Sequence, residues 1–269
     1  MKRYLMSAIS AMGVLGLLSL LPLVGQDGPP AEGGTKGKGK GAKQRPKGGA
    51  APRLTDGKPD FGGPGVWGVP YVTDMAKASQ WGGTDVDVPF QAHAKELFQQ
   101  RVNTVSKDDP EGYCLPPGVP RMMYTPYPME VLQLPNRWVF IYEGGAHVWR
   151  SVPIGPKEAL KHPADPNPTY LGDSYGYWDG DTMVIDVVGF NERTWLDFAG
   201  HPHGEKLHVV ERYTREDTLN LRYTATIDDP EYYTKPWDVT VYIPYRATDK
   251  LLEYICQENN RDTQHLVGK

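Results

Sequence analysis

The chain has 269 residues, and its formal net charge of −4 conceals an uneven distribution of charge. Nine of the 29 basic residues but only two of the 33 acidic residues precede Leu54, which leaves a formal charge of −11 on residues 54–269. About 215 residues fit one domain with a substantial core. The basic residues gather in a segment without interleaved aromatics, which excludes nucleic acid as a partner.

Residues 1–25 have the features of a signal peptide. Lys2 and Arg3 supply the positive start, and residues 5–24 form a long apolar core. Gly25 is a small residue at the expected cleavage point, and no cysteine follows it, which excludes a lipoprotein anchor. An uncleaved anchor is the alternative, because about 20 apolar residues also span a bilayer. The sequence therefore predicts an exported protein that is periplasmic, extracellular or tethered to the outer face of the inner membrane.

Residues 26–53 consist mainly of Gly, Lys, Pro and Ala. Such a segment cannot bury enough apolar area to offset its ordering entropy, so we expect a disordered basic linker. Its cations offer a contact to anionic lipid or to an anionic envelope polymer, and a solvated spacer is the alternative. These cations are Lys36, Lys38, Lys40, Lys43, Arg45, Lys47 and Arg53.

Cys114 and Cys256 are the only cysteines, and neither belongs to a CxxC motif. Outside the cytoplasm such a pair favours a disulfide, and two buried reduced thiols are the alternative. Thioredoxin-like redox chemistry has no support without the CxxC spacing.

The domain is expected to begin with an extended arm over residues 54–84, which are rich in glycine, proline and aromatics. A helix follows over residues 90–101, where apolar residues recur with a 3.6-residue period. Pro89 opens this helix, with Asp87 as its candidate cap. Residues 114–121 form a proline loop.

The rest of the domain is predicted to be β-structure. Nine strand-like segments cover residues 129–134, 137–143, 147–153, 175–178, 182–188, 207–214, 219–227, 237–243 and 251–256. Short turns such as Asp179-Gly180 separate several of them, and this dipeptide is typical of a two-residue hairpin. We therefore expect an antiparallel meander, closed as a calycin-like or lipocalin-like barrel or folded as a sandwich. A small barrel of this kind either fills its interior with side chains or holds one small ligand.

Several motifs recur together along the chain: RLTDGKPDF, CLPPGVPR, GxSxGxWxGDTxVxD, TWLD, GxPHxxxLHxxER and ENNxDxxHLVGK. With these motifs the chain resembles a family of exported bacterial proteins of unassigned function. The resemblance covers most of the chain from Arg53 onward. It implies an architecture and an exported location, and it implies no reaction.

A histidine cluster gives the sharpest chemical hypothesis. His201 and His203 flank a proline that favours extended backbone, so both rings can face one side, and His208 follows. Three imidazole nitrogens with a nearby carboxylate suit Zn²⁺, Cu²⁺ or Fe²⁺. A structural loop whose histidines form local hydrogen bonds is the alternative.

The same cluster also supports a hypothesis of acid–base catalysis without metal. His203 or His208 would act as the general base, and Asp197 or Glu211 would orient it. Arg212 would stabilise an anionic substrate or an oxyanion.

Two further side chains stand in suggestive contexts. Ser174 lies in a G-x-S-x-G sequence, but that motif needs a strand before it and a helix after it, and here a hairpin follows. We expect Ser174 to bond backbone at a strand entrance. Asp186 interrupts an apolar run, and it either faces outward or pairs with an arginine such as Arg212 inside the sheet.

Aromatic side chains support a binding function. The chain holds 16 tyrosines and seven tryptophans, and Trp195, Trp178 and Tyr177 lie in or beside the motif-rich half. Such rings stack on sugars and line apolar pockets. We therefore expect a protein that binds a small molecule or glycan-like ligand. The alternatives are a metal-dependent or histidine-based hydrolase or lyase, and a structural envelope protein.

Overall fold

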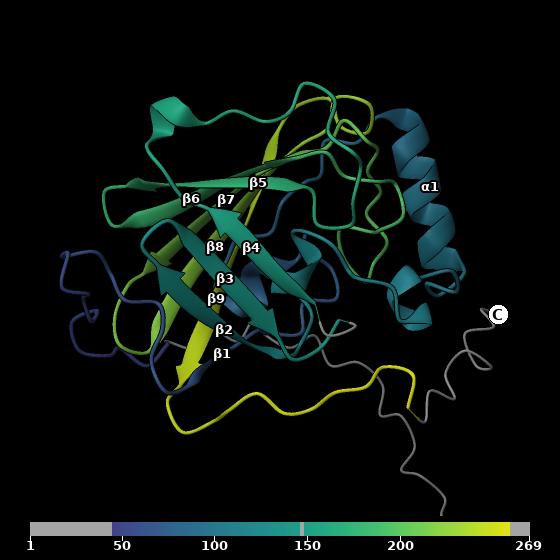
Figure 1. The fold of residues 1–269 in the computed structure, drawn as a ribbon. Helices are drawn as coiled ribbons and strands as arrows, with labels where there is room; N and C mark the ends of the chain where they lie inside the picture. Colours follow the sequence, from purple (N-terminus) through teal and green to yellow (C-terminus); the bar gives the residue numbers. More distant parts are fainter. Residues whose placement is uncertain (1–44, 146–147, 259–269) are drawn as a thin grey trace, which may run out of the picture. The chain divides into compact units, whose positions relative to one another are not determined.

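The computed structural model describes residues 45–145 and 148–258, which belong to one compact unit (Figure 1). The predicted signal peptide and residues 26–44 of the predicted linker lie outside these ranges. Within them, no helix combines the length and the apolar character needed to cross a membrane.

A mainly β domain is confirmed, because nine strands form one antiparallel sheet in the order β4-β3-β2-β1-β9-β8-β7-β6-β5. The strands are β1 (Val66–Gly68), β2 (Pro128–Leu134), β3 (Arg137–Tyr142), β4 (Trp149–Pro153), β5 (Asp173–Asp179), β6 (Thr182–Val188), β7 (His208–Arg215), β8 (Asn220–Asp228) and β9 (Trp237–Arg246). The helix α1 (Ala92–Asn103) is joined by four short 3-10 helices, η1 (Ala78–Trp81), η2 (Pro110–Tyr113), η3 (Arg121–Met123) and η4 (Lys157–Ala159).

The sheet curls until its two edge strands meet, with β2–β4 crossing over β5–β8 (Figure 1). The edges β4 and β5 touch at a single bridge between Ile154 and Gly176, so the sheet is not closed into a barrel. Trp138 on β3 packs against Tyr213 on β7 and Trp178 on β5, which shows that side chains fill the space between the two halves. This packing removes the apolar face of every long strand from water.

Strand β1 comes from the predicted arm and joins the two halves of the sheet. Trp67 pairs with Met129 on β2 and with Tyr245 on β9. The sequence did not predict this strand, because it has only three residues and lies between glycine- and proline-rich stretches.

From Arg45 onward, where the description of the chain begins, the end of the segment assigned to the linker contacts the sheet. The Arg45 guanidinium lies 3.0 Å from the ring centre of Tyr242, and the Asn220 side-chain amide donates to the carbonyl of Pro46. Hydrogen bonds to β-sheet residues and a cation–π contact order these residues, although they bury little apolar area of their own.

Helix α1 is confirmed within two residues of its predicted bounds. Its N-cap is Gln91, which makes no side-chain capping bond, so Asp87 is not the cap. The stability of α1 comes from packing rather than from capping, since Phe98 stacks on Phe90 with ring centres 5.2 Å apart.

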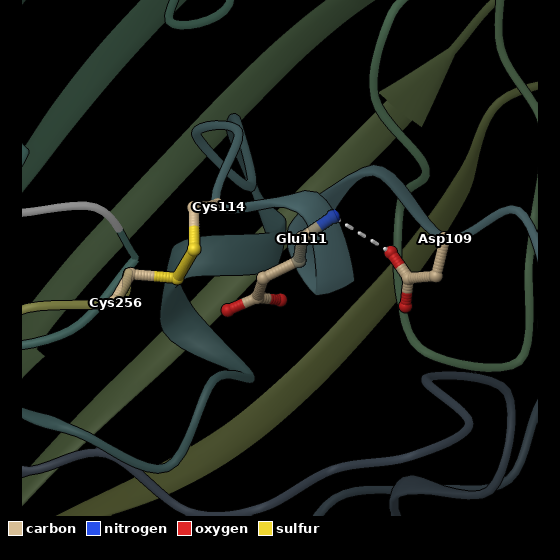
Figure 2. Close-up of a disulfide and its surroundings, with 4 residues drawn as sticks. All are labelled: Asp109, Glu111, Cys114 and Cys256. Atoms are coloured by element: carbon tan, nitrogen blue, oxygen red, sulfur yellow. Dashed lines mark hydrogen bonds between the residues drawn. A yellow bond between two sulfur atoms is a disulfide. The ribbon is translucent and has the colours of Figure 1, made fainter. Parts of the chain in front are cut away.

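The disulfide between Cys114 and Cys256 is confirmed, with Cα atoms 5.7 Å apart. Figure 2 shows this bridge beside Glu111, whose backbone N–H donates to Asp109 over 3.1 Å. The prediction of a strand over residues 251–256 is wrong. Both edges of β9 are already occupied by β1 and β8, so the last described segment is fixed by the disulfide instead of by a ladder.

Candidate functional site

The loop over residues 189–207, between β6 and β7, carries His201 and His203 and packs against helix α1 (Figure 1). The ring of His201 is 1% exposed and lies 4.3 Å from the ring centre of Phe98. It is also nearly parallel to the ring of Phe90, at 5.5 Å. His201 is therefore a packed core residue at the helix–sheet junction.

Asp197 holds this loop in shape. One of its oxygens accepts backbone N–H bonds from Gly200 and His201, and the other accepts from Met75 and from the His201 ring at 2.7 Å. Burial raises the pKa of Asp197, but His201 and these N–H donors outweigh it and hold the pKa below its usual value. The carboxylate is ionised and its lone pairs are used by the protein itself.

Asp74, Asp197 and His201 are the one group among the described residues whose potential metal-ligand atoms all lie within 4.8 Å of one another. The donor set fits a metal poorly, because both oxygens of Asp197 already accept two hydrogen bonds each. Asp74 accepts the backbone N–H of Ala76, and burial raises the pKa of its carboxyl group. The cluster is better explained as the anchor of the loop.

His203 lies in a different environment from His201. Its Nε2 is 2.7 Å from the Thr194 hydroxyl, and its Nδ1 donates to the carbonyl of Gly204 at 3.1 Å. Burial lowers the pKa of His203, which favours the neutral ring. Both ring nitrogens are occupied by local partners, as the structural-loop alternative predicts.

His208 starts β7 and points to the outer face of the sheet, away from the loop. Its Nε2 lies 3.0 Å from Asp186 Oδ1 on β6, and this hydrogen bond raises the pKa of His208. The same oxygen is 3.0 Å from Nε2 of His162, whose Nδ1 lies 2.7 Å from Asp173. Asp186 thus faces outward and pairs with histidines instead of an arginine. Sequence reasoning missed His162 because it lies in an irregular connection 24 residues away.

Glu211 and Arg212 fall on opposite faces of β7, because successive strand residues alternate. Arg212 is exposed and donates to Thr226 over 3.3 Å. Glu211 is fully buried and forms an ion pair with Arg150 of β4 over 2.6 Å.

The interior of the sheet holds a polar cluster around Glu211. Tyr213 and Tyr223 donate to one of its oxygens at 2.7 and 2.9 Å. Arg150 also donates to the hydroxyl of Ser174 on β5, so Ser174 is a hydrogen-bond acceptor and not an activated nucleophile. The cluster ties β4, β5, β7 and β8 together across the region where the sheet stays unclosed.

The predicted metal ligands and the predicted catalytic set do not converge. His201 and His203 lie in the loop beneath α1, whereas His208 lies on the outer face of the sheet. The five predicted catalytic residues are divided among three places: Asp197 and His203 lie in the loop, His208 and Arg212 lie on the outer face of the sheet, and Glu211 lies in its interior. The physical reason is strand alternation together with a loop that turns its histidines toward the helix.

A cleft of about 410 Å³ opens at one end of the sheet, and we call it the tryptophan cleft. It is bounded by the arm, the β2–β3 turn and the ends of β4 and β5, through Leu54, Thr55, Asp56, Lys58, Gln133, Leu134, Pro135, Trp138, Ile154 and Trp178. The rings of Trp138 and Trp178 meet edge to face with centres 5.6 Å apart. The volume falls in the range of small-molecule sites.

Of the three predicted ligand-binding aromatics, the structure places only Trp178 in this cleft. Tyr177 follows the alternation of β5 to the other face, where Lys157 lies 5.5 Å from its ring centre. Trp195 is buried in the loop beneath α1, with the Arg101 guanidinium 4.5 Å from its ring centre.

The cleft offers polar groups beside its two indoles. The indole N–H groups of Trp138 and Trp178 donate to no other described residue, and neither nitrogen is sealed from solvent. Lys58 lies 5.1 Å from the Trp178 ring centre and donates to the carbonyl of Gly180. Asp56 is exposed and uses one oxygen to accept the backbone N–H of Lys58.

Comparison of the chain with protein-family models, with curated proteins and with solved structures gives no match. The resemblance drawn from the motifs therefore stays a prediction, and function has to be argued from the chemistry of the chain.

Proposed function

We propose that the protein binds a small glycan-like molecule in the tryptophan cleft. The observation that carries this proposal is the partly exposed indole of Trp178 beside Asp56 and Lys58 in a cleft of about 410 Å³, which the buried Trp138 also lines. Sugar rings stack their C–H faces on indole, and their hydroxyls accept indole N–H bonds.

The remaining polar groups of the cleft fit the same ligand class. Asp56 accepts hydroxyl donors, and Lys58 donates to hydroxyl or carbonyl oxygens. Gln133 is not available, because its amide oxygen accepts from the Phe61 N–H and its amide nitrogen donates to the Pro59 carbonyl. The Trp178 indole, the Asp56 carboxylate and the Lys58 ammonium form the recognition set.

Titration of the protein with short soluble oligosaccharides, followed by intrinsic tryptophan fluorescence and calorimetry, tests the proposal. Trp178→Ala is expected to weaken binding roughly tenfold or more, since it removes a stacking surface. Trp149→Ala is the matched control, because Trp149 is 65% exposed on β4 and lies outside the cleft.

Trp178 also packs against Phe61, so a melting curve is used to establish that the Trp178→Ala variant is folded. Asp56→Asn is a second cleft variant, and it changes an exposed side chain outside the core. Absence of oligosaccharide binding, or equal binding by wild type and both cleft variants, contradicts the proposal. The first of these outcomes favours the structural envelope protein.

A further inference from the structure

The outward side of β2, β3 and β4, which we call the apolar face, differs from the rest of the sheet. These strands form the front layer in Figure 1, and large apolar side chains occupy their outward positions: Leu132, Leu134, Val139, Ile141 and Trp149. Trp149 is 65% exposed, and Leu132 and Leu134 are 45% and 48% exposed. The outward positions of β8 are instead Arg222, Thr224, Thr226 and Asp228. A sheet face in water is normally polar, as on β8, so the apolar face has the composition of a covered surface.

The charged side chains of the apolar face are separated along the strands. Arg137 points outward at the start of β3, opposite Leu134, and Glu130 points outward on β2, opposite Ile141. Position 141 is four residues after position 137, which corresponds to about 13 Å along the strand. Neither Arg137 nor Glu130 forms an ion pair with another described residue. The face therefore has a positive end and a negative end with apolar residues between them.

We propose that the apolar face binds the same face of a second copy of this chain. A two-fold axis that lies between the two faces and runs across the strands places the positive end of each copy over the negative end of the other. Arg137 of one copy then faces Glu130 of the partner subunit, and the apolar residues of the two copies meet in the middle. Sheets pack face to face in this manner about 10 Å apart, with their strands nearly aligned.

Charge favours a second copy over a lipid surface. Apolar surfaces that bind lipid are flanked by lysine and arginine, which attract anionic head groups. The apolar face carries one such cation, Arg137, and two carboxylates, Glu130 and the adjoining Glu143. The same charges become two symmetry-related attractive pairs when a second copy covers the face.

The size of the apolar face sets the expected strength of association. Strands β2, β3 and β4 have seven, six and five residues. Their face is therefore roughly 20 Å long and about 14 Å wide. That is small beside the roughly 800 Å² of accessible surface that each partner contributes to a standard stable interface. We therefore expect a dimer with a dissociation constant of about 10–100 μM.

Sedimentation equilibrium of the full chain over concentrations of about 1–300 μM tests the proposal. Trp149→Ala and Leu132→Asp are each expected to weaken association about tenfold or more, because both residues lose apolar contact area. Tyr71→Ala is the matched control, since Tyr71 is 48% exposed and lies outside the sheet. Every variant keeps the apolar residues 5–24 unchanged, so association through that segment would not respond to these substitutions.

Exchanging the two charges tests the orientation of the copies. Arg137→Glu and Glu130→Arg are each expected to weaken association about fivefold or more, because each brings like charges together. The double variant restores opposite charges and is expected to associate within about threefold of the wild type. Melting curves establish that all variants are folded.

A chain that stays monomeric over the whole concentration range overturns the proposal. If such a monomer changed its tryptophan fluorescence with neutral lipid vesicles, and Trp149→Ala abolished the change, lipid would be the occupant of the face. A dimer that is unaffected by Trp149→Ala and Leu132→Asp uses another surface, which also overturns the proposal. Failure of the double charge variant to recover association rules out the two-fold arrangement. None of the substituted residues lines the tryptophan cleft, so oligosaccharide binding can fail or succeed independently.

Discussion

At the scale of single residues, Arg150 and Glu211 form an ion pair that is buried in the core. Both side chains are at most 3% exposed, and the charged atoms are 2.6 Å apart. Burial lowers the pKa of Arg150, but the Glu211 carboxylate outweighs it and raises that pKa. Tyr213 and Tyr223 each donate a hydrogen bond to the other oxygen of Glu211.

Arg150→Met is expected to destabilise the protein by about 3–5 kcal/mol, because it leaves Glu211 as an unpaired buried charge. Urea unfolding followed by tryptophan fluorescence measures this change. The double variant Arg150→Met with Glu211→Met is the control, and it should recover part of the loss because both charges are removed together. If Arg150→Met were as stable as the wild type, the unpaired charge of Glu211 would not destabilise the protein, and the prediction would be wrong.

At the scale of elements, helix α1 and the loop over residues 189–207 stabilise each other. Phe98 of α1 contacts the His201 ring, and Arg101 donates to the carbonyl of Gly200 over 3.1 Å. The imidazole of His201, which was predicted from the sequence to be a metal ligand, thus forms part of the surface on which helix α1 packs. His208 lies outside this loop, at the start of β7.

Phe98→Ala is expected to cost about 2–4 kcal/mol and to speed amide hydrogen exchange throughout α1, because it removes the ring between helix and loop. Val102→Ala on the same helix is the matched control, since Val102 is 42% exposed. That control should change stability by less than about 0.5 kcal/mol. Equal exchange rates in the two variants would contradict the role given to Phe98.

The whole molecule is held by two connections between distant parts of the chain. Strand β1 from the arm lies between β2 and β9, and the disulfide joins Cys114 to Cys256 across 142 residues. The disulfide is consistent with an exported protein. Beside it, the backbone N–H of Leu252 donates to Glu143 over 2.7 Å, so the segment after β9 is fixed at two points.

Replacing both cysteines by serine is expected to lower stability by up to about 4–5 kcal/mol, since the unfolded chain regains the entropy of a long loop. Thermal and urea unfolding measure the loss, and wild-type protein treated with a reductant should match the double variant. Faster exchange confined to residues 251–256, with unchanged global stability, would show that the bridge only anchors the terminal segment.

Periodicity alone was sufficient for most of the fold. The alternation of apolar residues over 219–227 predicted β8, because a strand with one buried face must repeat every two residues, and only Leu219, which is 38% exposed, falls outside the strand. The Asp179-Gly180 dipeptide likewise predicted the β5–β6 hairpin. Compartment chemistry predicted the disulfide without any geometry.

The grouping of side chains into sites was decided by the tertiary structure. Closeness in sequence linked His203, His208 and Glu211, but alternation and the turn of the loop sent them to three different surroundings. Arg150 pairs with Glu211, and His162 pairs with Asp186. Each pair joins segments that only the curl of the sheet brings together. A linear pattern records the period of an element and its turns. Contacts between elements depend on how the sheet closes, which no local pattern encodes.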